Sequence, residues 1–439
     1  MARSGVLLVA AVAVVLLVAA FASWRRLAGP LIDALPEALR QQLADAVFRR
    51  MARLSARGTA RGARPLSIVV DGGGSYGGGS YGASVDAPGA AVLRVRDSRR
   101  LVRAVLLDGD TGLGETYTDG DVWTVDASDV DGVCQLVAAF ILADRAGGGG
   151  SRGGCEEAGI ERVAEHYDVG NDFYARFLTD PLMAYSCGFF LRPDDDLAAA
   201  QRNKVDAVVR KLAPASGERV LDVGCGWGRI AQHVADATGA TVTGTTVSAE
   251  QVAGAPAGVD VRLCDMLSPA CVDALLAERG PFAKIYSIGM LEHVGGRRIA
   301  ACFAHFARLL ADGGLLLVHC ITAEDADKER GAIRRSFISK HIFPGGEVPN
   351  ASWVLQDARA AGFSPLHVET FGGQHYARTL REWRANLLAA SPEARDASDA
   401  GRRVRTFEFY FAMCEAVFRT SECVVTQFLF VKRALLPVT

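Results

Sequence analysis

The stretch that decides the fold of this chain is Arg219-Val220-Leu221-Asp222-Val223-Gly224-Cys225-Gly226-Trp227-Gly228. An apolar run that ends in an acid and leads into alternating glycines predicts a buried strand, a tight turn and a helix from about Arg229. Glycine is required where the backbone takes a positive φ or approaches a ligand closely. The helix behind the turn presents unpaired N–H groups. A dinucleotide-binding G-x-G-x-x-G pattern would need glycine at Arg229, so the spacing argues against that class of ligand.

Strands that alternate with helices continue from this turn, which is the pattern of a doubly wound parallel sheet. Seven strands are expected, at residues 219–223, 241–244, 260–263, 284–287, 314–319, 366–370 and 424–431. A helical insertion rich in aromatic residues is expected at 379–416. The glycine spacing resembles the first loop of class I S-adenosylmethionine (SAM) methyltransferases, and this resemblance implies an α/β fold with SAM at the turn.

Polar side chains follow the successive strands of this predicted sheet. In chain order they are Asp222, Thr246, Gln251, Asp265, Glu292 and His319. Each of them alone has a structural explanation, such as a helix cap or a buried histidine with a partner. Ligands of such sheets bind beyond the carboxyl ends of the strands, so the group as a whole predicts a ligand site at that edge.

The composition limits the classes of partner. The chain has 439 residues, with 48 basic side chains against 50 acidic ones. This balance argues against nucleic acid as the main partner. The ten cysteines include no C-x-x-C pair, so we expect no metal site and no disulfide framework, and reduced thiols of an intracellular protein.

The N-terminus carries an uncharged apolar run at residues 5–24, followed by many arginines. Such a run is long enough to span the hydrocarbon core of a bilayer. A cleaved signal peptide with Ala20-Phe21-Ala22 as its processing site is the alternative. Because the arginines lie after the run, we expect a single-pass transmembrane anchor with the catalytic part on the cytoplasmic side.

The rest of the N-terminal third predicts a basic amphipathic helix and a small β-rich domain. The helix would lie on an anionic membrane surface or pack on the next domain. In the small domain we expect strands near 66–70, 92–95, 102–107 and 122–125, a flexible Gly/Ser/Tyr loop at 71–83, and a helix near 133–142. The expected domains are 1–30 (anchor), 31–64 (amphipathic helix), 65–146 (β-rich domain), 147–159 (Gly-rich linker) and 160–439 (methyltransferase domain).

Further motifs occur in a fixed order: GLGETYTDG at 112–120, HYDVGNDFY at 166–174, YSCG at 185–188, SAEQ at 248–251, SIGMLEHVG at 287–295, FPGG at 343–346, HYARTL at 375–380 and FY at 409–410. In this order they resemble the cyclopropane-fatty-acyl-phospholipid synthase family and its mycolic-acid relatives. The resemblance covers residues 160–433 nearly end to end. It implies transfer of the SAM methyl group to the cis double bond of an unsaturated phospholipid acyl chain in a membrane.

The resemblance also implies the reaction and its site residues. The alkene attacks the methyl group, and a bound bicarbonate ion takes a proton from the resulting carbocation so that the ring closes. The bicarbonate cradle maps onto Cys187, Glu292, His319, the backbone of Ile321, and Tyr376. The residues that the resemblance places at SAM are Tyr185, Ser186, Gly224, Gly226, Thr246, Val247 and Gln251, with Asp265 near the adenine. Asp222 is assigned to the same site because it lies at the end of the strand before the glycine turn. A homodimer is a candidate assembly.

The residue types suit this chemistry. Imidazole, phenol and backbone N–H groups donate to an anion, and a carboxylate beside it can orient the histidine. A carbocation needs a closed apolar pocket. The candidates for its lining are Phe173, Phe189, Phe190, Phe343 and Trp383.

Three alternatives remain open from the sequence. The same carbocation could lose a different proton and give a methyl- or methylene-branched chain. Small-molecule N-methyltransferases share the fold and a similar Glu-His loop, but would not need Cys187, His319 and Tyr376 together. A catalytically inactive lipid-binding protein is the third, because the segment after Gln251 is shorter than is usual in the family.

Overall fold

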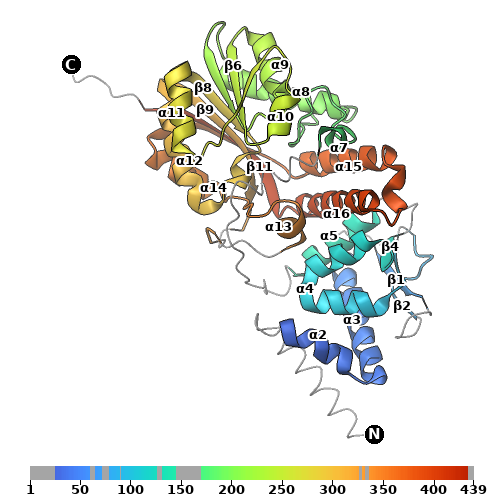
Figure 1. The fold of residues 1–439 in the computed structure, drawn as a ribbon. Helices are drawn as coiled ribbons and strands as arrows, with labels where there is room; N and C mark the ends of the chain where they lie inside the picture. The colour runs from blue at the N-terminus through green and yellow to red at the C-terminus, as the bar shows by residue number, and fades with distance from the viewer. Residues whose placement is uncertain are drawn as a thin grey trace. The chain divides into compact units, whose positions relative to one another are not determined.

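The computed structural model describes residues 25–59, 65–71, 79–88, 90–125, 131–144, 170–325, 329–331 and 336–433. The chain divides into two compact units, which are described separately below. The first comprises residues 1–153, 335–341 and 391–420, and the second comprises residues 154–334, 342–390 and 421–439. Figure 1 labels many of the elements of both units.

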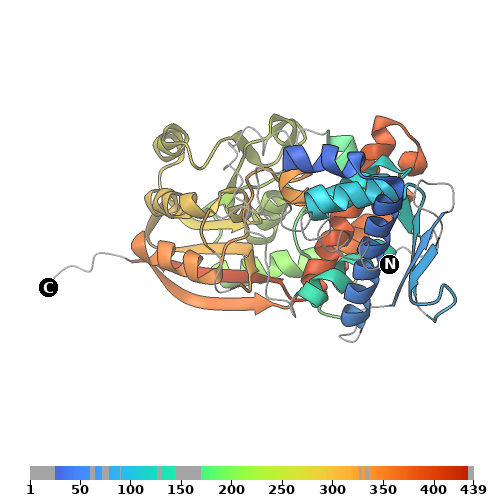
Figure 2. The same ribbon diagram turned by 90° about the horizontal axis from the view of Figure 1, so that it is seen from below.

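The second unit is built on a seven-stranded sheet with the strand order β10-β11-β9-β8-β5-β6-β7. The strands are β5 (Arg219–Val223), β6 (Thr241–Thr246), β7 (Asp260–Leu263), β8 (Phe282–Ile288), β9 (Leu310–Ala323), β10 (Phe363–Phe371) and β11 (Cys423–Lys432). Strands β5 to β9 pair in parallel, whereas β11 runs antiparallel to both β9 and β10. Figure 2 shows β10 and β11 side by side in orange and red. The predicted class I methyltransferase sheet and its seven strands are confirmed.

Helices cover both faces of this sheet (Figure 1). Helices α8 (Leu197–Leu212) and α9 (Arg229–Thr238) pack on one face, in a core with Val220 and Val242. Helices α11 (Pro269–Arg279), α12 (Ile299–Leu309) and α14 (Ala351–Ala360) pack on the other face. Because β5 is buried on both sides, residues 220–223 are all buried and do not alternate with exposed ones, as expected for a central parallel strand.

Shorter elements of the second unit lie around the carboxyl edge of the sheet. They are α7 (Asn171–Ala175), α10 (Ala249–Ala253), the 3₁₀ turns η2 (Leu291–His293) and η3 (Gly296–Arg298), and α15 (Gln374–Ala389). The expected insertion at 379–416 is divided between the units. Its first part is α15, and η4 (Pro392–Arg395) and α16 (Asp399–Arg419) belong to the first unit.

The first unit combines helices with a small sheet. Its sheet has the order β2-β1-β3-β4, with β1 (Leu66–Val70), β2 (Gly79–Gly82), β3 (Ala91–Val95) and β4 (Trp123–Val125). Its other helices are α2 (Arg25–Ala34), α3 (Glu37–Thr59), α4 (Ser98–Asp119), α5 (Gly132–Asp144) and α13 (Phe337–His341). The description of this part as β-rich was therefore wrong, since it is an α+β unit.

Three local predictions in this unit were wrong. The run 102–107 is part of helix α4, because the Asp97 side chain caps the helix by accepting a hydrogen bond from the Arg100 N–H at 2.9 Å. Part of the loop expected at 71–83 forms strand β2, in which the Tyr81 hydroxyl donates to Asp45 at 2.8 Å. The expected helix at 31–64 is two helices, α2 and α3, since the residue before Pro36 is disfavoured in a helix.

The fold class needs a further correction. In the part of the chain that the structure describes, no helix has the length and apolar composition needed to cross a bilayer. The run at 5–24, on which the transmembrane helix was predicted, lies outside the described residues, as does the Gly-rich stretch at 147–154. Over the described residues, the fold class is therefore the α/β methyltransferase fold with an α+β N-terminal unit, and no transmembrane helix is found among these residues.

The expectation that the cysteines are all reduced was also wrong. Cys264 and Cys271 form a disulfide with a Cα–Cα distance of 5.8 Å. The two residues lie on either side of the loop between β7 and α11, so the chain reversal there brings them together.

Candidate functional site

The glycine turn after β5 forms the floor of the site. Gly224, Gly226 and Gly228 have φ values of 77°, 56° and 71°, which favour glycine. The N–H groups of Gly224 and Cys225 both donate to the carbonyl of Thr245 at 2.9 Å, so the turn is tied to β6. A Cβ at Gly224 would lie 2.8 Å from the Cβ of Met290. The turn therefore needs glycine there for its conformation and for space.

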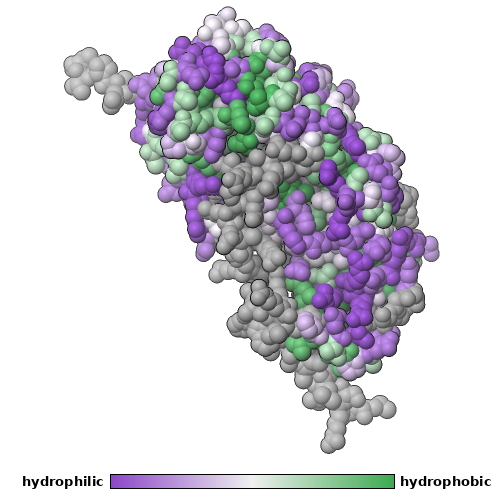
Figure 3. Space-filling model, viewed as in Figure 1, coloured by the Kyte–Doolittle hydropathy of each residue, from purple (hydrophilic) through white to green (hydrophobic). Residues whose placement is uncertain are grey.

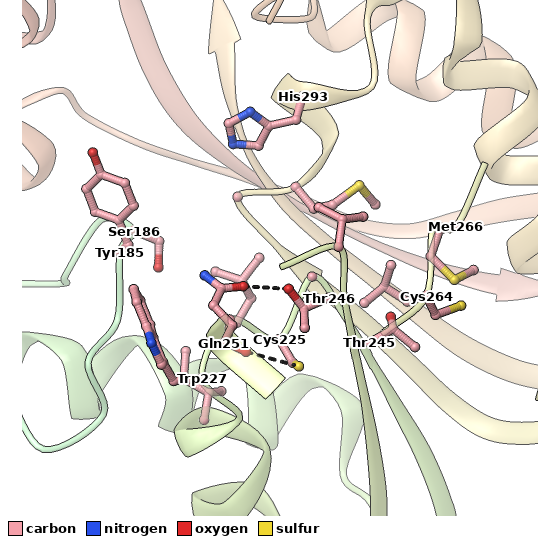
Figure 4. Close-up of a pocket in the computed structure, with 18 of the residues that line it drawn as sticks. Tyr185, Ser186, Cys225, Trp227, Thr245, Thr246, Gln251, Cys264, Met266 and His293 are labelled. Carbon is pink, nitrogen blue, oxygen red and sulfur yellow. Dashed lines mark hydrogen bonds between the residues drawn. The ribbon is translucent and has the colours of Figure 1, made fainter. Parts of the chain in front are cut away.

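A cavity opens above this turn at the carboxyl edge of the sheet. Eight of the nine residues that the sequence assigned to SAM line it, namely Tyr185, Ser186, Gly224, Gly226, Thr246, Val247, Gln251 and Asp265. The ninth, Asp222, is buried on β5 and is not part of the lining. Figure 4 shows Tyr185 and Ser186 on one side of the cavity and Cys264 and Met266 on the other. In Figure 3, hydrophobic side chains gather at the surface where Figure 1 draws β6, α9 and α10.

The polar side chains after β6 are fixed by short local contacts. The Thr246 hydroxyl donates to Gln251 Oε1 at 2.5 Å, the hydrogen bond drawn in Figure 4. The side chain of Ser248 caps α10 by accepting from the Gln251 N–H at 3.2 Å. Because its Oε1 is already an acceptor, the Gln251 amide has its NH₂ group left to donate to a ligand.

A buried lysine supports the segment that carries Tyr185 and Ser186. Lys204 is fully buried, and its Nζ donates to Ser186 Oγ at 2.7 Å and to Gln201 Oε1 at 2.6 Å. Gln201 Nε2 in turn donates to the carbonyls of Ala184 and Ser186, at 3.3 and 2.8 Å. Helix α8 thus holds this loop through a connected buried network, which stiffens it.

The charges in this network are strongly perturbed. Burial lowers the pKa of Lys204 to about 8, although Asp180, Cys187 and Asp222 raise it in part. Burial raises the pKa of Asp222 to about 7, against the opposing effects of Tyr286 and Lys204. Shifts of this size are typical of functional sites.

A carboxylate beside the cavity has one oxygen committed and one available. Glu292 lies on η2, and its Oε1 accepts from the Ile321 N–H at 2.7 Å. Its Oε2 is buried and has no hydrogen-bond partner among the described residues. Burial raises the pKa of Glu292 to about 7. The Ile321 N–H, which the sequence assigned to bicarbonate, thus donates to Glu292 in this structure.

His319 lies two residues before Ile321 on β9 and is 3 % exposed. Its carbonyl accepts from the Gly289 N–H at 2.8 Å, which joins the ends of β8 and β9. Its Nδ1 lies 3.2 Å from Gln427 Nε2. The partner of Nδ1 is therefore an amide from β11, and the expected orienting role of a carboxylate stays a prediction.

Cys187 and Tyr376 come from the two remaining segments around the site. Cys187 is buried, and burial raises its thiol pKa to about 12, so it is a neutral thiol. The N–H of Gly188 donates to Thr379 Oγ1 at 3.0 Å, which ties this loop to α15. Tyr376 lies one turn earlier on α15, with its ring 6.1 Å from that of Trp383.

The predicted catalytic residues do not belong to the lining of the cavity. Cys187, Glu292, His319, Ile321 and Tyr376 are absent from the lining, whereas Ser186 and His293, the chain neighbours of two of them, belong to it. Burial lowers the pKa of His293 to about 4, so this imidazole is neutral. The assignment of these five residues to the reaction stays a prediction.

The expected aromatic residues lie near the site without lining the cavity. The Phe189 ring stacks on Phe371 at 4.0 Å and on His319 at 5.8 Å. Phe343 contacts His293 at 4.9 Å, and Trp383 lies 5.1 Å from Tyr185. Phe173 packs against Tyr174 and Phe177, and Phe190 lies under the guanidinium of Arg378.

Sequence reasoning missed three polar residues of this region, Lys204, Lys211 and Gln427. One signal could have pointed to Lys204. The buried face of α8 is formed largely by apolar residues, and Gln201 and Lys204 interrupt it one turn apart. Two adjacent polar residues on an apolar helix face predict a buried network. No comparable pattern marks Gln427, which lies in an apolar strand.

The residues of the cavity fit SAM. Hydroxyl, amide and carboxylate groups from Ser186, Thr246, Gln251 and Asp265 suit its amino-acid and ribose ends. Apolar side chains, among them Met266, Leu267, Ile288 and Met290, suit a flat adenine ring. The glycine turn lets the backbone approach a ligand closely where a Cβ would not fit.

Comparison with known proteins gives consistent matches. Residues 156–428 match the family model described as mycolic acid cyclopropane synthetase. The chain is 36% identical to a probable fatty acid methyltransferase of Pseudomonas putida over 284 residues, covering 62% of this chain and 69% of that protein. It is 33% identical to the cyclopropane-fatty-acyl-phospholipid synthase of Escherichia coli over 363 residues, covering 80% of this chain and 90% of that protein. The crystal structure of mycolic acid cyclopropane synthase CmaA1 complexed with SAH and CTAB matches with a TM-score of 0.52 and 31% identity, covering 63% of this chain and 99% of that one.

Proposed function

Because the chain belongs to the mycolic acid cyclopropane synthetase family, we propose that it transfers a methylene group from SAM to the cis double bond of an unsaturated phospholipid acyl chain and forms a cyclopropane ring. The family resemblance read from the sequence motifs is thereby confirmed, and the chain is a SAM-dependent methyltransferase. The phospholipid substrate is proposed from the relative that matches over 90% of its own length.

The cavity residues have defined tasks in this proposal. Ser186, Thr246 and Gln251 hold the polar groups of SAM, and Asp265 takes the adenosine end. When bound, SAM supplies an electrophilic methyl group on a sulfonium centre. The glycine turn and Met290 close the floor of the cavity, so that water is excluded from that side.

The observation that carries the proposal is the different surroundings of the two carboxylate oxygens of Glu292. One oxygen is anchored on the Ile321 N–H, and the other is buried without a partner among the described residues. A buried acceptor without a partner is costly unless a ligand donates to it. Bicarbonate has the O–H group that such an acceptor needs, and its negative oxygens need donors.

The other predicted residues supply donors for that ion. In the proposal, His319 and the Tyr376 hydroxyl donate to bicarbonate, and the neutral thiol of Cys187 adds a weak donor. Bicarbonate so held would be the base that takes the proton before the ring closes. Glu292 then fixes the orientation of the ion.

The proposal is tested by mass spectrometry of the membrane lipids of bacterial cells that make no cyclopropane lipids of their own and express this chain. The expected result is that monounsaturated acyl chains gain one CH₂ and lose their double bond. Cells that express the Glu292→Gln variant at the same level should show no gain. Lipids unchanged by the wild-type chain would contradict the proposal, and chains that gain a saturated methyl branch would replace the cyclopropane product with a branched one.

A further inference from the structure

A row of polar side chains crosses three neighbouring strands beside the site. Glu369 on β10 is paired in register with Gln427 on β11, and Gln427 is paired with His319 on β9. Residues directly opposite each other on paired strands point to the same face of the sheet, so these three side chains are neighbours. Gln427 is 1 % exposed and His319 is 3 % exposed.

A lysine from helix α8 fixes the orientation of the central amide. Lys211 Nζ donates to Gln427 Oε1 and to Glu369 Oε2, both at 2.5 Å. The ammonium also lies over the Phe371 ring, 5.4 Å from its centre. An ammonium group can only donate hydrogen bonds, so the end of the Gln427 amide that faces it is the carbonyl oxygen.

The orientation of the amide determines the protonation of the histidine. With its oxygen turned to Lys211, Gln427 presents its NH₂ group to His319 Nδ1, at 3.2 Å. An NH₂ group can only donate, so Nδ1 must carry a lone pair rather than a proton. A neutral imidazole has one N–H group, which is then on Nε2.

The surroundings of the ring favour the same state. Phe189 stacks on the imidazole, with the two ring centres 5.8 Å apart. Burial, together with the positive charges of Lys204 and Lys211, holds the pKa of His319 well below its ordinary value. A neutral ring is therefore expected over the whole physiological range of pH.

We infer that Gln427 and Lys211 are positioning residues that hold His319 as the neutral tautomer with its proton on Nε2. The consequence for the reaction rests on the proposed function: His319 serves as a hydrogen-bond donor to the bound anion, and it does not accept the proton that leaves the substrate. Glu369 has a supporting role, since it takes a second hydrogen bond of Lys211 and holds the ammonium in place.

The inference is tested by two-bond ¹H–¹⁵N correlation spectra of the full-length chain labelled with ¹⁵N-histidine. These spectra distinguish a protonated ring nitrogen from a bare one, and the chain has only eight histidines. The His319 signals are identified by their loss in a His319→Gln variant. The expected result for the wild-type chain is a protonated Nε2 and a bare Nδ1. A proton on Nδ1, with or without one on Nε2, would overturn the inference.

Two variants test the roles of the positioning residues. In Gln427→Glu, a carboxylate that can only accept faces Nδ1, so the proton should move to Nδ1 and kcat should fall about 100-fold, the scale of losing one donor to a buried charge, with KM for SAM unchanged. In Lys211→Met the amide is free to turn, so both tautomers should appear. Wild-type spectra from a folded variant would refute the role of the residue replaced. If Gln427→Glu does not fold, Lys211→Met carries the test.

The spectra also separate this inference from the proposed function. A chain that makes no cyclopropane lipid but shows the expected tautomer and its reversal would leave the inference standing and remove the proposed function. A chain that makes cyclopropane lipid with a proton on Nδ1 of His319 would do the opposite.

Discussion

We expect the free energy of unfolding of the Glu292→Gln variant to increase relative to that of wild type as the pH rises. Burial raises the pKa of Glu292 to about 7 from an ordinary value of 4.5, so the folded chain keeps this proton up to about pH 7 whereas the unfolded chain loses it near pH 4.5. A carboxyl whose folded pKa lies above its unfolded pKa destabilises the fold as the pH rises through that window, and the cost is constant above it. At about 1.4 kcal/mol per pH unit, the cost reaches about 3 kcal/mol.

The assay is chemical unfolding of both chains at about pH 4.5 and about pH 8.5, the two ends of the window. The glutamine side chain leaves its own NH₂ group without a partner, but this cost does not depend on pH and cancels when the two conditions are compared. We expect the stability of Glu292→Gln relative to wild type to increase by about 3 kcal/mol between the two conditions. Glu324→Gln is the matched control, because Glu324 is exposed and its charge is hydrated in both states.

The reasoning is refuted if Glu292→Gln and wild type lose or gain stability in parallel across this pH range. That result would mean that the carboxyl ionises in the folded chain as it does in water. The same variant should make no cyclopropane lipid, so it would combine raised stability at alkaline pH with lost activity. Such a combination is expected where a site stores an unfavourable buried group for function.

Three further predictions follow from the site. Gly224→Ala should weaken SAM binding and should destabilise the fold by about 2 kcal/mol more than Gly217→Ala does. Both positions have a positive φ, but only a Cβ at Gly224 would meet Met290. Calorimetry measures the SAM affinity, and unfolding curves measure the stability. The affinity of the wild-type chain for SAM should decline above about pH 8, because Lys204 loses its proton there and no longer offers an ammonium donor to Ser186. The Lys204→Met variant should bind SAM more weakly than wild type at lower pH and should show no such decline. Titration calorimetry across this pH range checks both expectations. Reduction of the Cys264–Cys271 disulfide should lower the free energy of unfolding by about 2 kcal/mol. It should also weaken SAM binding, because the bridged loop carries Asp265 and Met266 of the cavity lining. The double variant Cys264→Ser, Cys271→Ser should behave as the reduced protein, with or without reductant.

The sheet and the cavity could be predicted from the sequence because their signals are local. Buried parallel strands read as short apolar runs, and the glycines at 224, 226 and 228 mark the turn that the positive φ values require. The residues after successive strands meet at one edge for topological reasons, so the part of the cavity lining that follows β5, β6, β7 and β8 could be predicted from strand ends, whereas the segment 182–186 could not. Ser186 and Tyr185 came only from the family resemblance.

The features that the sequence did not predict depend on contacts and pairings that the local pattern of residues does not specify. Gln427 faces His319 because β11 pairs with β9 in one register, and nothing in an apolar strand specifies that register. The run at 102–107 is short enough to be a strand or a helix by its pattern, and the cap at Asp97 decides for a helix. Pairing of Cys264 with Cys271 depends on the path of one loop, so cysteine spacing did not reveal it.

The central claim is that the anion beside Glu292 removes a proton from the transferred methyl group before the ring closes. It is tested most directly with the purified chain, bicarbonate, vesicles of monounsaturated phospholipid, and SAM whose methyl group carries three deuterium atoms. The account predicts an acyl chain with a cyclopropane ring that has kept two of the three deuterium atoms. A product that keeps all three, or no transfer of label from SAM bound in the cavity, would contradict it.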